Sequence, residues 1–142
     1  MNLVKTLLLL VSFFVVNAKA DAPLEYPKPQ SPDELHSLFA QYFDAKDLNG
    51  LTTLFAANAT FILDRDGRRA TGHKEIAKAL KPYLSFDSKM QTLSKSIHIN
   101  GNIALIRSQW KLADSDISGT ALEVMTFQQG GWVYLIDNPN GF

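Results

Sequence analysis

Cysteine is absent from the 142 residues of the chain. A disulfide framework, a thiol nucleophile and a thiolate metal site are therefore excluded. Without disulfides the domain must be held together by its hydrophobic core, and a chain of this length buries enough surface for that. Hydrophobic residues make up 46% of the sequence. This proportion is typical of a globular protein and not of a disordered one.

An excess of positive charge is also missing, because 14 Lys and Arg residues face 14 Asp and Glu residues. Two of the lysines, Lys5 and Lys19, lie in an N-terminal leader, so the remainder is slightly acidic. Binding to a phosphate backbone requires clustered Lys and Arg. The three arginines between positions 65 and 69 are interrupted by Asp66, and we interpret them as an exposed turn. Nucleic acid is therefore not expected as a partner.

Histidines are few, at positions 36, 73 and 98, and no two of them have the spacing of a helical metal-ligand pair. Glycine-rich phosphate loops and the G-x-S-x-G nucleophile motif are missing too. The sequence therefore predicts neither a metal site nor a cofactor.

The N-terminal residues 1–20 have the pattern of a cleavable signal peptide. Lys5 supplies the positive region, residues 7–16 form an apolar stretch, and Ala18-Lys19-Ala20 is a small-residue cleavage site. The apolar stretch is about half of the ~20 residues that a membrane-spanning helix needs. We predict an exported protein, periplasmic or secreted, with no membrane attachment after cleavage. An uncleaved membrane anchor is the alternative.

Residues 21–32 contain four prolines and are predicted to form an extended arm. The domain itself is expected over residues 33–142. Ser31 is a suitable N-cap and Pro32 suits the first helical position, so a helix should begin here. Its apolar residues recur at spacings of three and four as far as Phe43, which predicts one buried face.

The pattern then predicts a short second helix that includes Phe55, a strand at residues 61–63 and a third helix from Gly72. From position 89 the pattern changes to four strands, and Asn100-Gly101 is the strongest hairpin signal. A two-residue turn there would pair Ile99 with Asn102. Helices followed by an antiparallel meander indicate the α+β class.

This hairpin register also predicts which side chains share the core face of the first two long strands. It places Gln91, Leu93 and Ile97 of one strand on the same face as Ile106 and Trp110 of the next.

A family resemblance is carried by residues 42–51 (YFDAKDLNGL), 54–60 (LFAANAT), Gly72, 103–106 (IALI) and 131–139 (GWVYLIDNP). Together these segments resemble the nuclear transport factor 2-like superfamily, in its SnoaL-like and ketosteroid-isomerase-like branch. The resemblance implies a cone-shaped fold, with N-terminal helices packed in a strongly curved antiparallel sheet. It also implies a pocket between helices and sheet, and often a homodimer. It does not specify a function, because this fold hosts many.

The resemblance permits one comparison of catalytic residues. The oxyanion tyrosine of ketosteroid isomerases falls on Phe39, their aspartate base falls on Leu63, and their second oxyanion donor falls near Glu123. Neither Phe39 nor Leu63 can carry out that chemistry. The chain is therefore not expected to be a ketosteroid isomerase.

Glu123 is the candidate catalytic residue. It lies on a predicted strand in which Glu123 is on one face and its neighbours Leu122 and Val124 are on the other. The resemblance places the face with Glu123 inward. A carboxylate among apolar side chains has a raised pKa and can act as an acid or base near neutral pH. The opposite face is equally apolar, so an outward, solvated Glu123 is the alternative. The expected pocket lining is Phe39, Phe61, Leu63, Trp110, Met125, Phe127 and Tyr134, and ordinary core packing is the alternative for each.

Three functions are compatible with these features. The first is an exported protein that binds a small molecule in an apolar pocket. The second is a cofactor-free isomerase or lyase that uses Glu123 as acid or base. The third is a dimeric interaction module with a filled cone, which pairs through the outer face of the sheet. A pocket with a buried acid and a second polar group would favour the enzyme.

Overall fold

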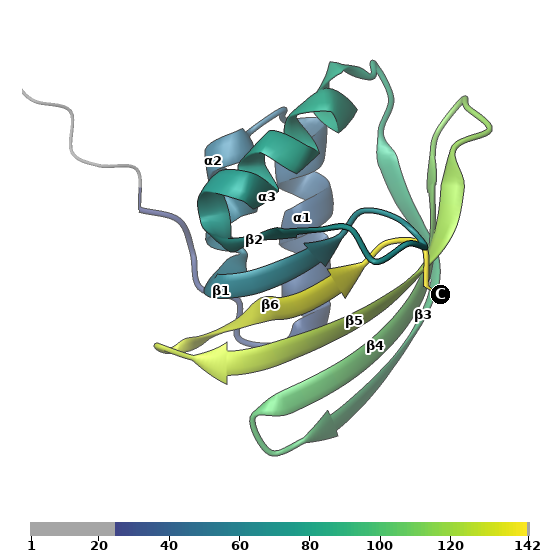
Figure 1. The fold of residues 1–142 in the computed structure, drawn as a ribbon. Helices are drawn as coiled ribbons and strands as arrows, with labels where there is room; N and C mark the ends of the chain where they lie inside the picture. Colours follow the sequence, from purple (N-terminus) through teal and green to yellow (C-terminus); the bar gives the residue numbers. More distant parts are fainter. Residues whose placement is uncertain (1–24, 142) are drawn as a thin grey trace, which may run out of the picture.

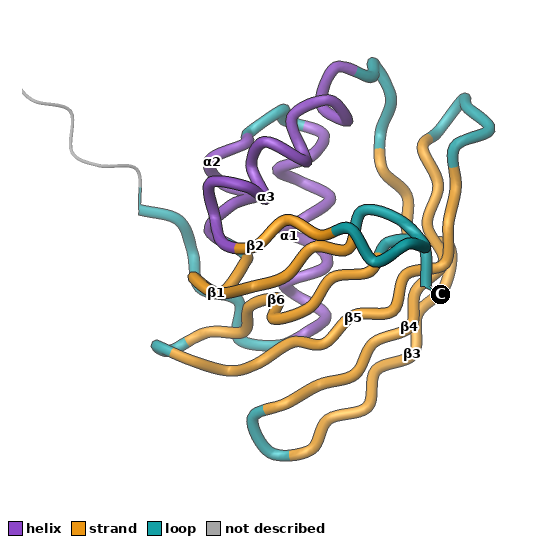
Figure 2. The backbone as a smooth tube through the Cα atoms, viewed as in Figure 1, coloured by secondary structure: helices purple, strands orange, loops and turns teal. Residues whose placement is uncertain are grey.

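The computed structural model describes residues 25–141, so the predicted leader and cleavage site lie outside the described residues. Helices are concentrated in the first half and long strands in the second, as Figures 1 and 2 show. The elements are α1 (Pro32–Asp44), α2 (Leu48–Thr53), β1 (Phe55–Ile62), β2 (Arg69–Thr71), α3 (Gly72–Leu80), the 3-10 helix η1 (Lys81–Ser85), β3 (Met90–Asn100), β4 (Ile103–Leu112), β5 (Ser118–Gln128) and β6 (Gly131–Asn138).

The strands form one sheet in the order β2-β1-β6-β5-β4-β3. The sheet curves, and the helices lie within the curve, so the predicted α+β cone is confirmed (Figure 1). One strand pair departs from the antiparallel pattern, because β1 and β6 run parallel. Parallel neighbours need a long connection, and β1 and β6 come from opposite ends of the domain. This pair joins the hairpin β1–β2 to the meander β3–β6.

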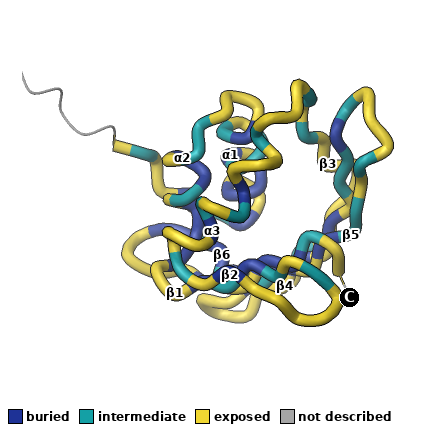
Figure 3. The backbone as a smooth tube through the Cα atoms, turned by 45° about the horizontal axis from the view of Figure 1, so that its top comes forward, coloured by how far each residue is buried: buried dark blue, intermediate teal, exposed yellow. Residues whose placement is uncertain are grey.

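Helix α1 begins as predicted. The Ser31 side chain accepts a hydrogen bond from the backbone N–H of Glu34, and Pro32 is the first helical residue. The apolar face of α1 packs on the sheet, and buried positions gather where the helices face the strands (Figure 3). The predicted second helix is too long, however. Phe55 starts β1 because its backbone pairs with Tyr134 of β6, a partner remote in sequence.

The β3–β4 hairpin differs from its predicted register. Gly101, with φ +60°, is the first residue of the turn, and Asn100 pairs with Ile103. A bulge at Leu93 then shifts the register, so that Thr92 pairs with Trp110 and Leu93 is 58% exposed. A bulge adds one residue to one strand and reverses which face the following side chains occupy. Thr92 therefore faces the interior where Gln91 and Leu93 were expected.

A second bulge lies in β6. Met125 of β5 pairs with Tyr134, but its neighbour Val124 pairs with Ile136, which leaves Leu135 as the extra residue. Tyr134 and Asp137 are consequently both buried, although three residues apart, while Ile136 lies on the outer face. The bulge thus brings a second acidic side chain into the interior of the cone.

The described part of the arm, residues 25–31, runs past the β5–β6 turn. The backbone N–H of Trp132 donates to the carbonyl of Pro29 at 2.8 Å, and the Tyr26 hydroxyl donates to Asp47 at 3.1 Å. Among the described helices, none is long and apolar enough to span a bilayer.

Candidate functional site

A cavity of about 210 Å³ lies between α1 and the concave face of the sheet. Its walls are largely apolar, with a small set of polar groups at one end, the composition expected of a small-molecule pocket. The lining residues are His36, Phe39, Ala40, Phe43, Phe61, Leu80, Tyr83, Met90, Thr92, Ser108, Trp110, Leu112, Ile117, Ser118, Ala121, Glu123, Tyr134, Asp137, Pro139 and Asn140.

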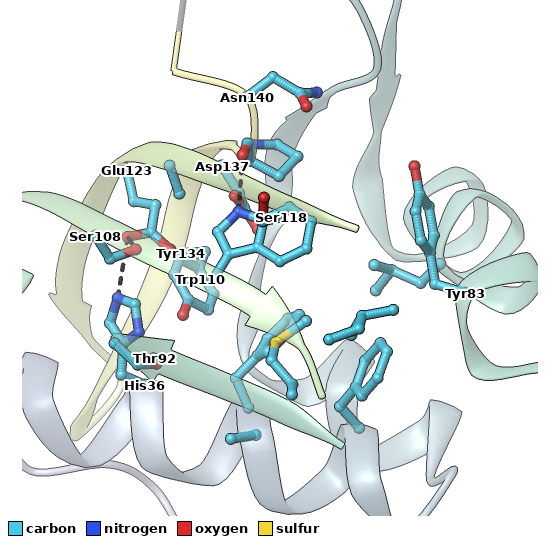
Figure 4. Close-up of a pocket in the computed structure, with 18 of the residues that line it drawn as sticks. His36, Tyr83, Thr92, Ser108, Trp110, Ser118, Glu123, Tyr134, Asp137 and Asn140 are labelled. Carbon is cyan, nitrogen blue, oxygen red and sulfur yellow. Dashed lines mark hydrogen bonds and ion pairs between the residues drawn. The ribbon is translucent and has the colours of Figure 1, made fainter. Parts of the chain in front are cut away.

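The polar end of the cavity is built around a His–Glu pair. His36 Nε2 lies 2.9 Å from Glu123 Oε2, and Ser108 Oγ donates to the same oxygen at 3.4 Å (Figure 4). His36 is 9% exposed and Glu123 5% exposed. A hydrogen bond between ionisable groups that are shielded from water is stronger than the same bond at the surface.

Helix α1 and strand β5 position this pair. His36 lies one turn before Phe39 and two turns before Phe43, so all three share the face of α1 that lines the cavity. Glu123 pairs with Ile106 of β4 and with Asp137 of β6, at the centre of the sheet. Strands on both sides hold its backbone, so the carboxylate has little freedom to move away from the ring.

The tautomer of the His36 ring is linked to the proton of Glu123. When Glu123 is ionised its carboxylate only accepts hydrogen bonds, and Nε2 of His36 then carries the proton that Glu123 accepts. The other nitrogen, Nδ1, makes no hydrogen bond within the described chain. In the neutral ring Nδ1 is therefore free to take a proton, and Glu123 stabilises the imidazolium that results.

Asp137 is a second buried carboxyl in the same cavity. It is 4% exposed, lies beside Glu123 on the neighbouring strand, and makes no side-chain hydrogen bond in residues 25–141. Burial, and then the charge of Glu123, raise the pKa of Asp137 well above its ordinary value. Burial likewise raises the pKa of the Tyr134 phenol, so that side chain stays neutral.

The opposite end of the cavity is bordered by exposed residues, with Tyr83 of η1 on one side and Asn140 on another (Figure 4). Trp110 forms the wall between the two ends, and its indole N–H donates to the carbonyl of Pro139 at 2.9 Å. Gly119 lies against both groups. A Cβ at Gly119 would lie 2.8 Å from the Trp110 ring and from the Pro139 carbonyl oxygen, so glycine permits this packing.

The structure brings five of the predicted site residues to the cavity. Glu123, Phe39, Phe61, Trp110 and Tyr134 all line it. The alternative in which Glu123 is solvated does not hold, because β5 presents Glu123 inward and Leu122 outward.

Three predicted lining residues do not reach the cavity. Leu63 is 38% exposed because β1 ends at Ile62 and Leu63 starts the turn to β2. Phe127 lies next to the end of β5, where it is part-exposed and packs edge-on against Trp132. Met125 faces inward but is fully buried in the packed core, beside Ala104 of β4 on the adjacent strand.

Several polar lining residues were not predicted, among them His36, Ser108 and Asp137. A signal for His36 exists, since it falls on the apolar stripe of α1 with Phe39 and Phe43. For Asp137 no sequence signal was available, because only the bulge at Leu135 turns it inward. The side-chain oxygen of its neighbour Asn138 accepts hydrogen bonds from the backbone N–H groups of residues 140 and 141.

No family model and no curated protein matches this sequence. Solved structures do match. A candidate scytalone dehydratase from Novosphingobium aromaticivorans is 14% identical over 75% of this chain and 78% of that chain, with a TM-score of 0.63. A nuclear transport factor 2-like protein of unknown function from Pseudomonas putida is 15% identical over 75% and 80%, with a TM-score of 0.61.

The chain has the nuclear transport factor 2-like fold. A third structure, a candidate association domain of a calcium/calmodulin-dependent protein kinase II from Thiobacillus denitrificans, shares this fold at 14% identity and a TM-score of 0.61. It is matched over 80% of this chain and 98% of its own length. Identities this low establish the nuclear transport factor 2-like fold and leave the function to be argued from the site.

Proposed function

We propose that this protein binds a small, largely apolar molecule in its cavity and moves a proton on it, as a cofactor-free isomerase or lyase. The observation that carries the proposal is the 2.9 Å contact between His36 and Glu123 in the wall of an apolar cavity. His36 Nδ1 takes a proton from carbon and returns it, while Glu123 holds the ring and balances its charge. The fold shared with a candidate dehydratase is compatible with this chemistry.

The aromatic walls provide the binding step. Phe39, Phe61 and Trp110 offer flat apolar surfaces to a ring-containing ligand. A cavity of about 210 Å³ also supports a ligand-binding protein over an interaction module with a filled cone. A protein that binds the ligand without catalysing a reaction is the alternative, and the test below distinguishes the two.

The test is solvent deuterium incorporation at the carbon next to the carbonyl of 1-tetralone, a small bicyclic ketone, followed by NMR. We expect the purified protein to accelerate exchange above the rate in buffer. If tetralone binds but its exchange proceeds only at the buffer rate, the protein binds the ligand without catalysing proton transfer, and the proposed chemistry is contradicted.

Export remains part of the proposal, since it rests on residues outside the described structure. The signal pattern predicts cleavage after Ala20, so that the mature protein begins at Asp21. N-terminal sequencing of the protein recovered from the exported fraction should read Asp21 first. Recovery of intact Met1 in the membrane fraction would contradict the prediction.

We further propose that the protein forms a homodimer through the outer face of the sheet. Leu105 pairs with Val124, and Val124 with Ile136, in a row across β4, β5 and β6. Leu105 and Ile136 are exposed, as are Ile103 and Leu122 beside them. A contiguous exposed apolar patch of this kind marks an interaction surface, and an association domain shares the fold.

Sedimentation velocity should therefore give the mass of two chains for the wild type and of one chain for Leu105→Asp. The matched control Leu93→Asp changes an exposed leucine at the β3 bulge, outside this patch, and should remain dimeric. A monomeric wild type at micromolar concentration would contradict the proposal.

A further inference from the structure

The titratable groups at the polar end of the cavity are mostly acids. Among residues 25–141, the lining contains the carboxyls of Glu123 and Asp137 and the imidazole of His36, and neither Lys nor Arg. The imidazole of His36 already contacts Glu123 through Nε2. A ligand anion would therefore meet carboxyl groups without any compensating cation, and burying an unpaired charge is costly. The cavity is unsuited to carboxylates and phosphates.

Asp137 is an acid in the cavity whose side chain makes no hydrogen bond to another described residue. It is nine-tenths or more buried, reaches the cavity surface and makes no side-chain hydrogen bond in the described chain. Buried polar groups are almost always hydrogen-bonded, and an exception calls for an explanation. A ligand in the cavity would supply the missing partner.

The state of Asp137 determines what that partner can be. Glu123 faces it from β5, Tyr134 lies on its own strand, and His36 approaches from α1. Its burial and its place beside the Glu123 carboxylate raise its pKa and favour the protonated, neutral carboxyl. A protonated carboxyl has an O–H group to donate. It can donate to a ligand oxygen, and because the described lining offers no Lys or Arg to offset a buried anion, an uncharged carbonyl or ether oxygen is the acceptor that costs least to bury.

The size of the cavity limits the ligand further. A cavity of about 150 Å³ accommodates benzene, so about 210 Å³ accommodates one substituted ring or two small fused rings. The ring walls Phe39, Phe61 and Trp110 suit a flat molecule.

We propose that Asp137 determines the ligand class: the cavity takes an uncharged molecule of one or two rings whose oxygen accepts a hydrogen bond from Asp137, and it excludes organic anions. This inference rests on the proposed function, for which it names the substrate class. Asp137 contacts the ligand, whereas His36 takes the proton and Glu123 holds the His36 ring.

The experiment is a calorimetric titration at pH 7 with three probes of similar skeleton and different charge: 1-tetralone, 1-naphthoate and 1-naphthylmethylamine. We expect tetralone to bind at least tenfold more tightly than either charged probe. Asp137→Asn, whose amide still donates, should bind tetralone within about threefold of the wild type. Asp137→Leu, which cannot donate, should weaken tetralone binding by about tenfold, the usual loss for a buried hydrogen bond.

The inference is overturned if naphthoate binds as tightly as tetralone, or if tetralone does not bind at all. It is also overturned if Asp137→Leu binds tetralone as tightly as the wild type does. Tightest binding of the amine, lost in Asp137→Asn, would show an ionised Asp137 and overturn it as well. Circular dichroism and thermal melting establish that both variants are folded.

The same probe separates this inference from the proposed chemistry. Glu123→Gln should bind tetralone while its exchange rate falls by about a hundredfold or more. If Asp137→Leu loses binding but no protein catalyses exchange, the ligand class stands and the proposed chemistry falls. If exchange occurs and Asp137→Leu binds normally, the role of Asp137 falls and the chemistry stands.

Discussion

Glu123→Gln is expected to lower the rate of deuterium exchange into 1-tetralone by about a hundredfold or more, the range found when an acid–base catalyst is disabled. The glutamine amide is nearly the same size as the carboxylate but carries no charge. It can no longer stabilise the imidazolium that forms when His36, 2.9 Å away, takes a proton. The measurement is the initial exchange rate by NMR at saturating tetralone.

The matched control is Glu25→Gln, the same chemical change at an exposed position of the arm. It should exchange at the wild-type rate. Ser108→Ala removes only the longer 3.4 Å hydrogen bond to Glu123 and should have a small effect. A Glu123→Gln rate within threefold of the wild type would remove Glu123 from the mechanism.

His36→Gln should cause a comparable loss, and the double variant His36→Gln/Glu123→Gln should be scarcely slower than either single variant. Residues that act as one catalytic unit give strongly non-additive losses. Losses that multiply would show that the two side chains act independently. Such a result would contradict the arrangement in which Glu123 works through the imidazole.

Asp137→Asn is expected to raise the thermal stability of the protein at pH 7. In the unfolded chain Asp137 is ionised at this pH, whereas burial beside Glu123 favours its protonated form in the folded protein. Each unit of such a pKa difference removes about 1.4 kcal/mol of stability. In a domain of this size about 1 kcal/mol corresponds to a change in Tm of roughly 4 °C.

The sign of the pH dependence follows from the same shift. Because the folded pKa of Asp137 is raised, the folded state holds a proton that the unfolded state has lost, and stability decreases as pH rises above the unfolded pKa. Below the unfolded pKa both states hold the proton and the penalty is absent. Melting curves of Asp137→Asn should therefore show a smaller loss of Tm between acidic and neutral pH.

The matched control is Asp116→Asn, the same substitution at an exposed position in the β4–β5 loop. It should leave the pH profile of Tm close to that of the wild type. If Asp137→Asn is less stable than the wild type at pH 7, Asp137 is ionised in the folded protein, and the hydrogen-bond donor inferred for the cavity is absent.

Local sequence patterns determined much of the framework. The N-cap at Ser31 and the apolar spacing that follows defined α1, because a helix start depends on neighbouring residues. Alternation along β5 was enough to propose that Glu123 and Met125 share a face, although the choice of the inner face came from the family resemblance. The α+β class followed from the order of helices and strands.

Tertiary structure decided the composition of the site. The bulges at Leu93 and Leu135 reverse the faces of β3 and β6, and a single extra residue in a strand is set by pairing with its neighbours and not by local propensity. Those bulges bring Thr92 and Asp137 to the cavity. The pairing of His36 with Glu123, 87 positions apart in the chain, exists only because α1 packs inside the curved sheet. Alternation along one strand carries no information about which helix faces it, so the His–Glu pair required the folded chain.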